Sequence, residues 1–207
     1  MTRPAITALI APLKLLALQI ASLGRRAEIL VTETDSGIDL LLRPEKRSEP
    51  DMDERMALAD FAERHKLARI GWEAPQGYEP LSARQEPAVD FGPARVALPP
   101  NAFLQPSRDG ESAIVAAVCA AAAGAKNIAD LYAGCGALSF PLSTIAPVHA
   151  YEGDSEMVQA IRRADTKRAV TAEIRDLARQ PLHHGELKNF DTIVFDPPRA
   201  GAKAQAE

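Results

Sequence analysis

The second half of the sequence contains four short apolar runs that alternate with helical patterns, and this alternation restricts the fold more than any other feature. Each run is nearly continuous in Val, Ile, Leu and Ala, which is typical of strands buried on both faces of a parallel sheet. The runs are Asn127–Tyr132, Val148–Glu152, Ala169–Ile174 and Thr192–Asp196. We therefore predict a Rossmann-like α/β unit, a parallel sheet with helices on both faces.

Helical patterns precede and separate these runs. Glu111–Ala123 is rich in Ala and ends at Gly124, a residue that commonly terminates helices. Two further helices are predicted at about Ala137–Ile145 and at Ser155–Ala164, the second with Asp154 as its N-cap. Strands and helices thus follow one another in the order that a parallel sheet requires.

The first half predicts a smaller α/β lobe. Its elements are an amphipathic helix within Ala5–Leu23, a hairpin of Arg26–Thr32 and Ile38–Leu42, a helix capped by Asp51, and a strand at Leu67–Trp72. The hairpin turn is Thr34-Asp35-Ser36-Gly37, whose Asp and Gly suit a tight turn. We expect the single tryptophan, at the end of its strand, to pack in the core.

The stretch from Pro75 to Pro106 is rich in Pro and Gly, and Pro99-Pro100 marks the predicted passage between lobes. We therefore place the domains at residues 1–98 and 99–207. The sequence ends eleven residues after Asp196, without a further strand to cover the fourth one. We expect a fragment of a longer protein, in which a homodimer is one way to cover the exposed strand edge.

Composition restricts the class of protein. With 46% hydrophobic and 25% charged residues, the 207-residue chain is typical of a soluble globular protein, and we expect it in the cytoplasm without a membrane role. A net charge of −4 argues against nonspecific coating of nucleic acid. Cys119 and Cys135 alone form no metal site, iron–sulfur site or disulfide framework.

A glycine turn, Asp130-Leu-Tyr-Ala-Gly-Cys-Gly136, follows the first strand of the second half and leads into a helix. Such a turn lets a ligand approach the backbone closely and offers it N–H groups. Glu152 follows Gly134 by 18 residues, close to the spacing at which an acid binds ribose hydroxyls. We predict a nucleotide-like ligand, and Ser139 in place of a third glycine argues against NAD and against an oxidoreductase.

These residues resemble the S-adenosylmethionine motif of class I methyltransferases, with Tyr151-Glu152-Gly153 similar to the segment that carries their ribose-binding acid. Three segments in order, Phe103-Leu-Gln105, Asp130-Leu-Tyr132 and Asp196-Pro-Pro-Arg-Ala-Gly201, resemble the family of RNA uracil-5 methyltransferases. The resemblance covers the second lobe, whereas the first lobe is similar only in the order of its elements.

The resemblance implies a site for S-adenosylmethionine and an RNA partner, either rRNA or tRNA. The implied cofactor-binding residues are Gln105, Asp130, Tyr132, Gly134, Gly136, Glu152, Asp176 and Asp196, and those implied for the substrate are Pro197, Pro198 and Arg199. Two positions depart from the family pattern: Ser107 stands where Asn is usual, and Ala137 where a polar residue is common.

In the family, a cysteine thiolate attacks carbon 6 of uracil, carbon 5 accepts the methyl group, and a base removes its proton. The resemblance implies that this cysteine and this base lie beyond Glu207, so no catalytic residue is expected in this chain. Cys135, between two turn glycines, and Cys119, on an apolar helix face, are both interpreted as bystanders. We expect weak cofactor binding and no turnover by this chain.

Other hypotheses remain at this point. An amino-directed nucleic-acid methyltransferase has an aromatic residue where Arg199 follows the two prolines, and a noncatalytic RNA-binding or assembly module would tolerate the departures at Ser107 and Ala137. Adjacent His183 and His184 are not interpreted as metal ligands. A basic run of Arg162, Arg163, Lys167 and Arg168 is interpreted as a solvated helix face rather than an RNA contact.

Overall fold

The computed structural model describes residues 3–46, 48–74, 77–199 and 201–206. It divides into two compact units, Met1–Val89 and Asp90–Glu207, which are described separately below. The domain boundary predicted after residue 98 stays a prediction. No helix among the described residues is both long and apolar enough to cross a lipid bilayer.

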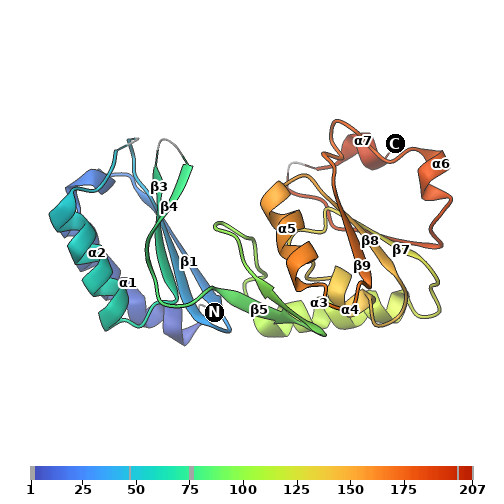
Figure 1. The fold of residues 1–207 in the computed structure, drawn as a ribbon, viewed down its shortest axis with the longest axis horizontal. Helices are drawn as coiled ribbons and strands as arrows, with labels where there is room; N and C mark the ends of the chain where they lie inside the picture. The colour runs from blue at the N-terminus through green and yellow to red at the C-terminus, as the bar shows by residue number, and fades with distance from the viewer. Residues whose placement is uncertain (1–2, 47, 75–76, 200, 207) are drawn as a thin grey trace. The chain divides into compact units, whose positions relative to one another are not determined.

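The first unit contains a four-stranded sheet in the order β1-β2-β3-β4, and Figure 1 shows α1 and α2 on the same side of it. The hairpin partners β1 and β2 are antiparallel, β2 and β3 are parallel, and β3 and β4 are antiparallel. The elements are α1 (Pro4–Gln19), η1 (Ala21–Leu23), β1 (Glu28–Thr34), β2 (Gly37–Arg43), α2 (Met52–Arg64), β3 (Arg69–Ala74) and β4 (Gly77–Ala83).

The start of α2 follows from its sequence. The Asp51 side chain accepts a hydrogen bond from the Glu54 N–H at 2.9 Å, and the Glu54 carboxylate accepts one from the Asp51 N–H. This reciprocal capping box confirms Asp51 as the predicted N-cap. Glu54 also accepts hydrogen bonds from the hydroxyl and N–H of Ser22, which tie α2 to η1.

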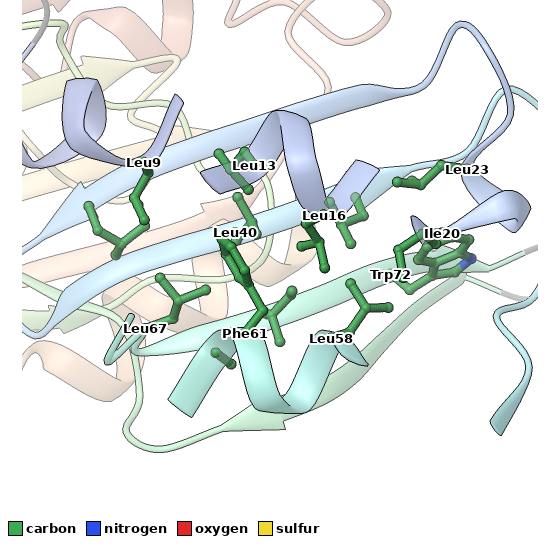
Figure 2. Packing of buried hydrophobic residues seen from close by; sticks show 14 residues of the cluster. Leu9, Leu13, Leu16, Ile20, Leu23, Leu40, Leu58, Phe61, Leu67 and Trp72 are labelled. Atoms are coloured by element: carbon green, nitrogen blue, oxygen red, sulfur yellow. The ribbon is translucent and has the colours of Figure 1, made fainter. Parts of the chain in front are cut away.

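Apolar side chains of both helices fill the space above the sheet. Figure 2 shows Leu13 and Leu16 of α1 directed toward Leu40 of β2, with Phe61 of α2 beside them. Trp72 is fully buried in the same cluster, and its indole N–H donates to the Ser48 carbonyl at 2.9 Å. The prediction that the tryptophan packs in the core is confirmed.

The second unit contains a parallel sheet in the order β10-β7-β8-β9, as the alternating pattern predicts. A separate two-stranded sheet pairs β5 (Ala88–Phe91) with β6 (Ala94–Ala97). The remaining elements are α3 (Arg108–Ala121), β7 (Ile128–Leu131), α4 (Ser139–Leu142), β8 (Val148–Glu152), α5 (Ser155–Ala164), β9 (Val170–Ile174), α6 (His184–Leu187), β10 (Thr192–Phe195) and α7 (Lys203–Ala206).

Two predicted helices need correction, and the Pro-rich and Gly-rich stretch contains strands that were not predicted. The Pro-rich and Gly-rich stretch holds β4, β5 and β6, because edge strands and short hairpins tolerate such residues where a central strand would not. The helix predicted at about Ala137–Ile145 is only the four-residue α4, and turns follow it. The helix predicted from Glu111 begins at Arg108 because the Ser107 side chain accepts a hydrogen bond from the Gly110 N–H and caps α3.

The strand β10 lies at the edge of its sheet, next to β7. Two of its apolar side chains are partly open to solvent, with exposed fractions of 46% for Ile193 and 40% for Phe195. These side chains are an incompletely covered apolar surface within the described residues. A homodimer that covers this edge stays a prediction.

Candidate functional site

A pocket of about 340 Å³ lies in the second unit, at the carboxyl ends of β7, β8 and β10. This is the edge of a parallel sheet at which α/β proteins bind their ligands. Six of the predicted cofactor-binding residues line it together: Gln105, Asp130, Tyr132, Gly134, Glu152 and Asp196. The structure therefore brings together four segments that lie 18 or more residues apart in the sequence.

The glycine turn forms the wall next to β7. Tyr132 and Gly134 both have positive φ, +64° and +55°, and the N–H groups of Tyr132 and Ala133 both donate to the Tyr151 carbonyl of β8. Gly136 has φ +87°, and a Cβ there would lie 2.9 Å from the Phe140 ring. Gly136 is thus behind the pocket wall, where its lack of a side chain lets the turn close onto α4 and α5.

The carboxylate of Glu152, at the end of β8, connects the glycine turn with the loop that follows β8. One carboxylate oxygen accepts a hydrogen bond from the Gly134 N–H at 2.9 Å, and the other accepts one from the Asp154 N–H at 2.9 Å. The turn was expected to offer N–H groups to a ligand, but the N–H of Gly134 is already engaged by the protein. A phosphate would have to displace the carboxylate from this donor, which argues against a phosphate at this point of the turn.

The charge of the pocket is uniformly negative. Its lining includes five carboxylates, and no Lys, Arg or His is found among the described residues that form it. The five are Glu111, Asp130, Glu152, Asp154 and Asp196. A pocket of this kind attracts cationic ligands and repels phosphates and other anions.

Asp130 is the innermost of these carboxylates. Its side chain is 1% exposed and accepts a hydrogen bond of 2.5 Å from the hydroxyl of Ser139, which is fully buried in α4. Burial raises the pKa of Asp130 to about 7; the Ser139 hydrogen bond opposes this rise, and the charges of Asp196 and Glu152 add to it. The carboxyl group therefore titrates near neutral pH.

Tyr132 supplies an aromatic wall and an unused polar group. Its ring meets Phe195 edge to face at a centroid distance of 5.8 Å. Its hydroxyl oxygen is buried and has no hydrogen-bond partner among the described residues. Because a buried hydroxyl without a partner is costly, a ligand that hydrogen-bonds to it would gain affinity.

Cys135 lines the pocket but is a poor nucleophile. Its side chain is 5% exposed, and its sulfur lies 3.0 Å from the thioether sulfur of Met157. Burial, followed by the charges of Glu152 and Asp154, raises the pKa of Cys135 to about 12. The thiol is therefore protonated at neutral pH and lacks the thiolate that nucleophilic attack requires.

Other predicted residues lie outside the pocket lining. The Asp176 carboxylate accepts hydrogen bonds from the N–H groups of Ala178 and Arg179, so it caps the turn that follows β9. Pro197, Pro198 and Arg199 are exposed. Their assigned roles toward the cofactor and the substrate stay predictions.

The pocket also contains residues that sequence reasoning did not assign to it. Phe91, Glu111 and Met157 reach it from β5, α3 and α5, elements whose relative placement no local pattern encodes. Ser139 was interpreted only as a missing glycine, whereas it is the hydrogen-bond partner of Asp130. No sequence signal pointed to this contact, because the helix was predicted to begin at about Ala137, whereas α4 begins at Ser139.

Sequence similarity to known proteins extends over nearly the whole length of the chain. An uncharacterised RNA methyltransferase from Rhizobium meliloti is 39% identical over an alignment of 208 positions, which covers 99% of this chain and 49% of that protein. The 23S rRNA (uracil(1939)-C(5))-methyltransferase of Tolumonas auensis is 30% identical over 97% of this chain and 47% of its own length. No family model matches the chain.

The fold has a counterpart among solved structures. The tRNA (uracil-54, C5)-methyltransferase of Pyrococcus abyssi, solved in complex with S-adenosyl-L-homocysteine, superposes with a TM-score of 0.62 at 16% identity. The match covers 86% of this chain and 45% of that one. At this identity the likeness establishes the fold, which is that of a Rossmann-like methyltransferase.

The chain spans about half the length of the curated relatives that it matches. Its sequence similarity to them extends across both units, including the first unit, for which the order of elements alone was weak evidence. Over nearly its whole length, the chain is therefore similar to about half the length of proteins that are named as RNA methyltransferases.

Proposed function

We propose that the pocket of the second unit binds S-adenosylmethionine and that the protein methylates carbon 5 of uridine in RNA. The observation that carries the first part is the uniform negative charge of the pocket, with five carboxylates and no basic side chain among its described lining residues. S-adenosylmethionine carries a sulfonium and an ammonium group, so this environment attracts it, whereas the phosphates of NAD or ATP would be repelled.

The residues present fit this cofactor. Glu152 stands at the end of β8 with free lone pairs on both oxygens, which suits the two hydroxyls of a ribose. The buried Tyr132 hydroxyl is a further polar group that a ligand would satisfy. When bound, S-adenosylmethionine supplies an activated methyl group, and the side chains named here orient it and exclude water from one side.

The substrate assignment is supported by the relatives. The relative from Tolumonas auensis is named as a methyltransferase for carbon 5 of a uracil in 23S rRNA, and the relative from Rhizobium meliloti is named as an uncharacterised RNA methyltransferase. The chemistry at carbon 5 needs a thiolate, and neither of the two cysteines of this chain fits that role. Cys135 is a buried thiol with its pKa raised to about 12, and Cys119 lies on α3 outside the pocket lining.

Calorimetric titration with S-adenosylhomocysteine tests the cofactor assignment. We expect the chain to bind it and Glu152→Ala to weaken binding at least tenfold, because this change removes the ribose partner and releases the Gly134 N–H. Glu156→Ala is the matched control, since Glu156 is an exposed acid of α5 outside the pocket lining. No binding by a folded sample, or equal binding by Glu152→Ala and wild type, would contradict the assignment.

Transfer of radiolabelled methyl groups to RNA tests the substrate assignment. We expect no labelled uridine with this chain alone, and labelled 5-methyluridine with a relative that is twice its length. Labelled adenine or guanine in the product digest would instead establish amino-directed methylation. Labelled uridine from this chain alone would refute the inference that neither cysteine serves as nucleophile.

A further inference from the structure

The Ser139–Asp130 pair has no role in the binding scheme above beyond the negative charge of Asp130. Ser139 is fully buried, and its hydroxyl donates a hydrogen bond of 2.5 Å to Oδ2 of Asp130. Ser139 is the first residue of the short helix α4, and its hydrogen-bond partner Asp130, in β7, lines the pocket. A buried hydroxyl that donates to a carboxylate favours the ionised form of that carboxylate.

We propose that Ser139 is a positioning residue for the cofactor site, which keeps the Asp130 carboxylate ionised and aimed at the positive charge of the bound cofactor. This inference rests on the proposed function, because it assigns a role toward the same ligand. If Ser139 has this role, the affinity for the cofactor depends on pH near neutrality. Ser139 occupies the position at which dinucleotide-binding turns have a glycine, and the inference gives its hydroxyl a function there.

Among the groups around Asp130, the Ser139 hydroxyl is the main one that stabilises the ionised carboxylate. The ionisable groups that face the pocket with it are the carboxylates of Glu111, Glu152, Asp154 and Asp196, the phenol of Tyr132 and the thiol of Cys135. None of these is a cation, and the charges of Asp196 and Glu152 oppose ionisation of Asp130. Neighbouring strands present only Val194 and Ala150 beside it. A cationic ligand therefore gains most from Asp130 when Ser139 holds the ionised form.

The direct test is a carbon-13 NMR titration of the Asp130 carboxyl group without ligand. Burial places its pKa at about 7 in the wild type, and we expect Ser139→Ala to raise the midpoint by about one pH unit, since a hydrogen bond to a charged group is lost. Ser139→Thr retains a hydroxyl and should restore the wild-type midpoint. An unchanged midpoint in folded Ser139→Ala would refute the inference, whatever the ligand does.

The second measurement compares Kd values for S-adenosylmethionine between Ser139→Ala and wild type at each pH, so that titration of the ligand itself cancels. With midpoints of about 7 and about 8, the Kd ratio should fall from about tenfold at pH 6, through about fivefold at pH 7, to about one at pH 9. A merely structural role for Ser139 would give the same ratio at every pH, and this result would overturn the proposal.

Two further results separate this inference from the proposed function. If folded wild-type protein binds no S-adenosylmethionine between pH 6 and 9, the proposed function fails, and the NMR midpoints still decide whether Ser139 supports ionised Asp130. If Ser139→Ala does not fold, Asp130→Asn serves in its place, because it keeps an acceptor for Ser139 and removes the charge. Its affinity should be lower than that of wild type at pH 8, and equal affinity would refute the inference.

Discussion

Substitution of Gly136 by Ala should destabilise the second unit by about 2 to 5 kcal/mol. Two costs contribute to this figure. A residue with a Cβ at φ +87° pays about 1 to 2 kcal/mol for the left-handed backbone. In addition, the new Cβ would lie 2.9 Å from Phe140 and 3.3 Å from Ile161, two buried side chains that have little room to move, and overpacking of this kind costs about 1 to 3 kcal/mol.

Gly124→Ala is the matched control for this prediction. Gly124 has φ +86°, almost the same as that of Gly136, but a Cβ there would meet nothing within 4 Å. It should therefore cost only the backbone part, about 1 to 2 kcal/mol. Native-state amide hydrogen exchange of β7 and β8 measures the free energy of opening in both variants. If Gly136→Ala and Gly124→Ala lowered this free energy equally, crowding of the new Cβ at position 136 would contribute nothing, and the reasoning would be refuted.

Two other predictions follow from buried ionisable groups. At pH 8 a disulfide reagent such as Ellman's reagent should modify the partly exposed Cys119 well before the buried Cys135, whose pKa is raised to about 12, and equal rates for the two thiols would contradict this assignment. Asp130 has its pKa raised from 3.8 to about 7, so the folded chain binds more protons than the unfolded chain between these values and loses stability as pH rises through them. Between pH 4 and pH 8, the free energy of unfolding measured with denaturant should fall by up to about 4 kcal/mol in wild type, and Asp130→Asn should lack this fall. Parallel pH profiles of this free energy in the two proteins would contradict the prediction.

Elements with strong local signals could be predicted to the residue. The bounds of β8 and α5 agree with the structure, and the Asp154 side chain caps α5 by accepting hydrogen bonds from the Glu156 and Met157 N–H groups. The capped amphipathic pattern encodes this helix locally. In contrast, β4 has Pro80 within it, and only its edge position and its pairing with β3 make it a strand.

In the candidate site, too, some contacts could be predicted from the sequence and others could not. That Gly134 and Glu152 lie close together could be predicted, because a fixed βαβ spacing brings the two chain segments together, whereas the hydrogen bond between them was not predicted. The hydrogen bond between Asp130 and Ser139 could not, because it depends on the side-chain direction of a residue placed by a four-residue helix after a turn. No sequence period records such a contact. The same holds for Phe91 and Met157, which reach the pocket from elements outside the glycine turn.

Glu152 accepts hydrogen bonds from the Gly134 and Asp154 N–H groups, so the ligand-binding role proposed for it would join stability and recognition in one side chain. The carboxylate organises the turn before any ligand arrives, so little ordering cost remains to be paid on binding. Natural selection cannot adjust the two properties separately at this position. A descendant that had lost its ligand would still retain an acid there, because the shape of the turn alone would require it.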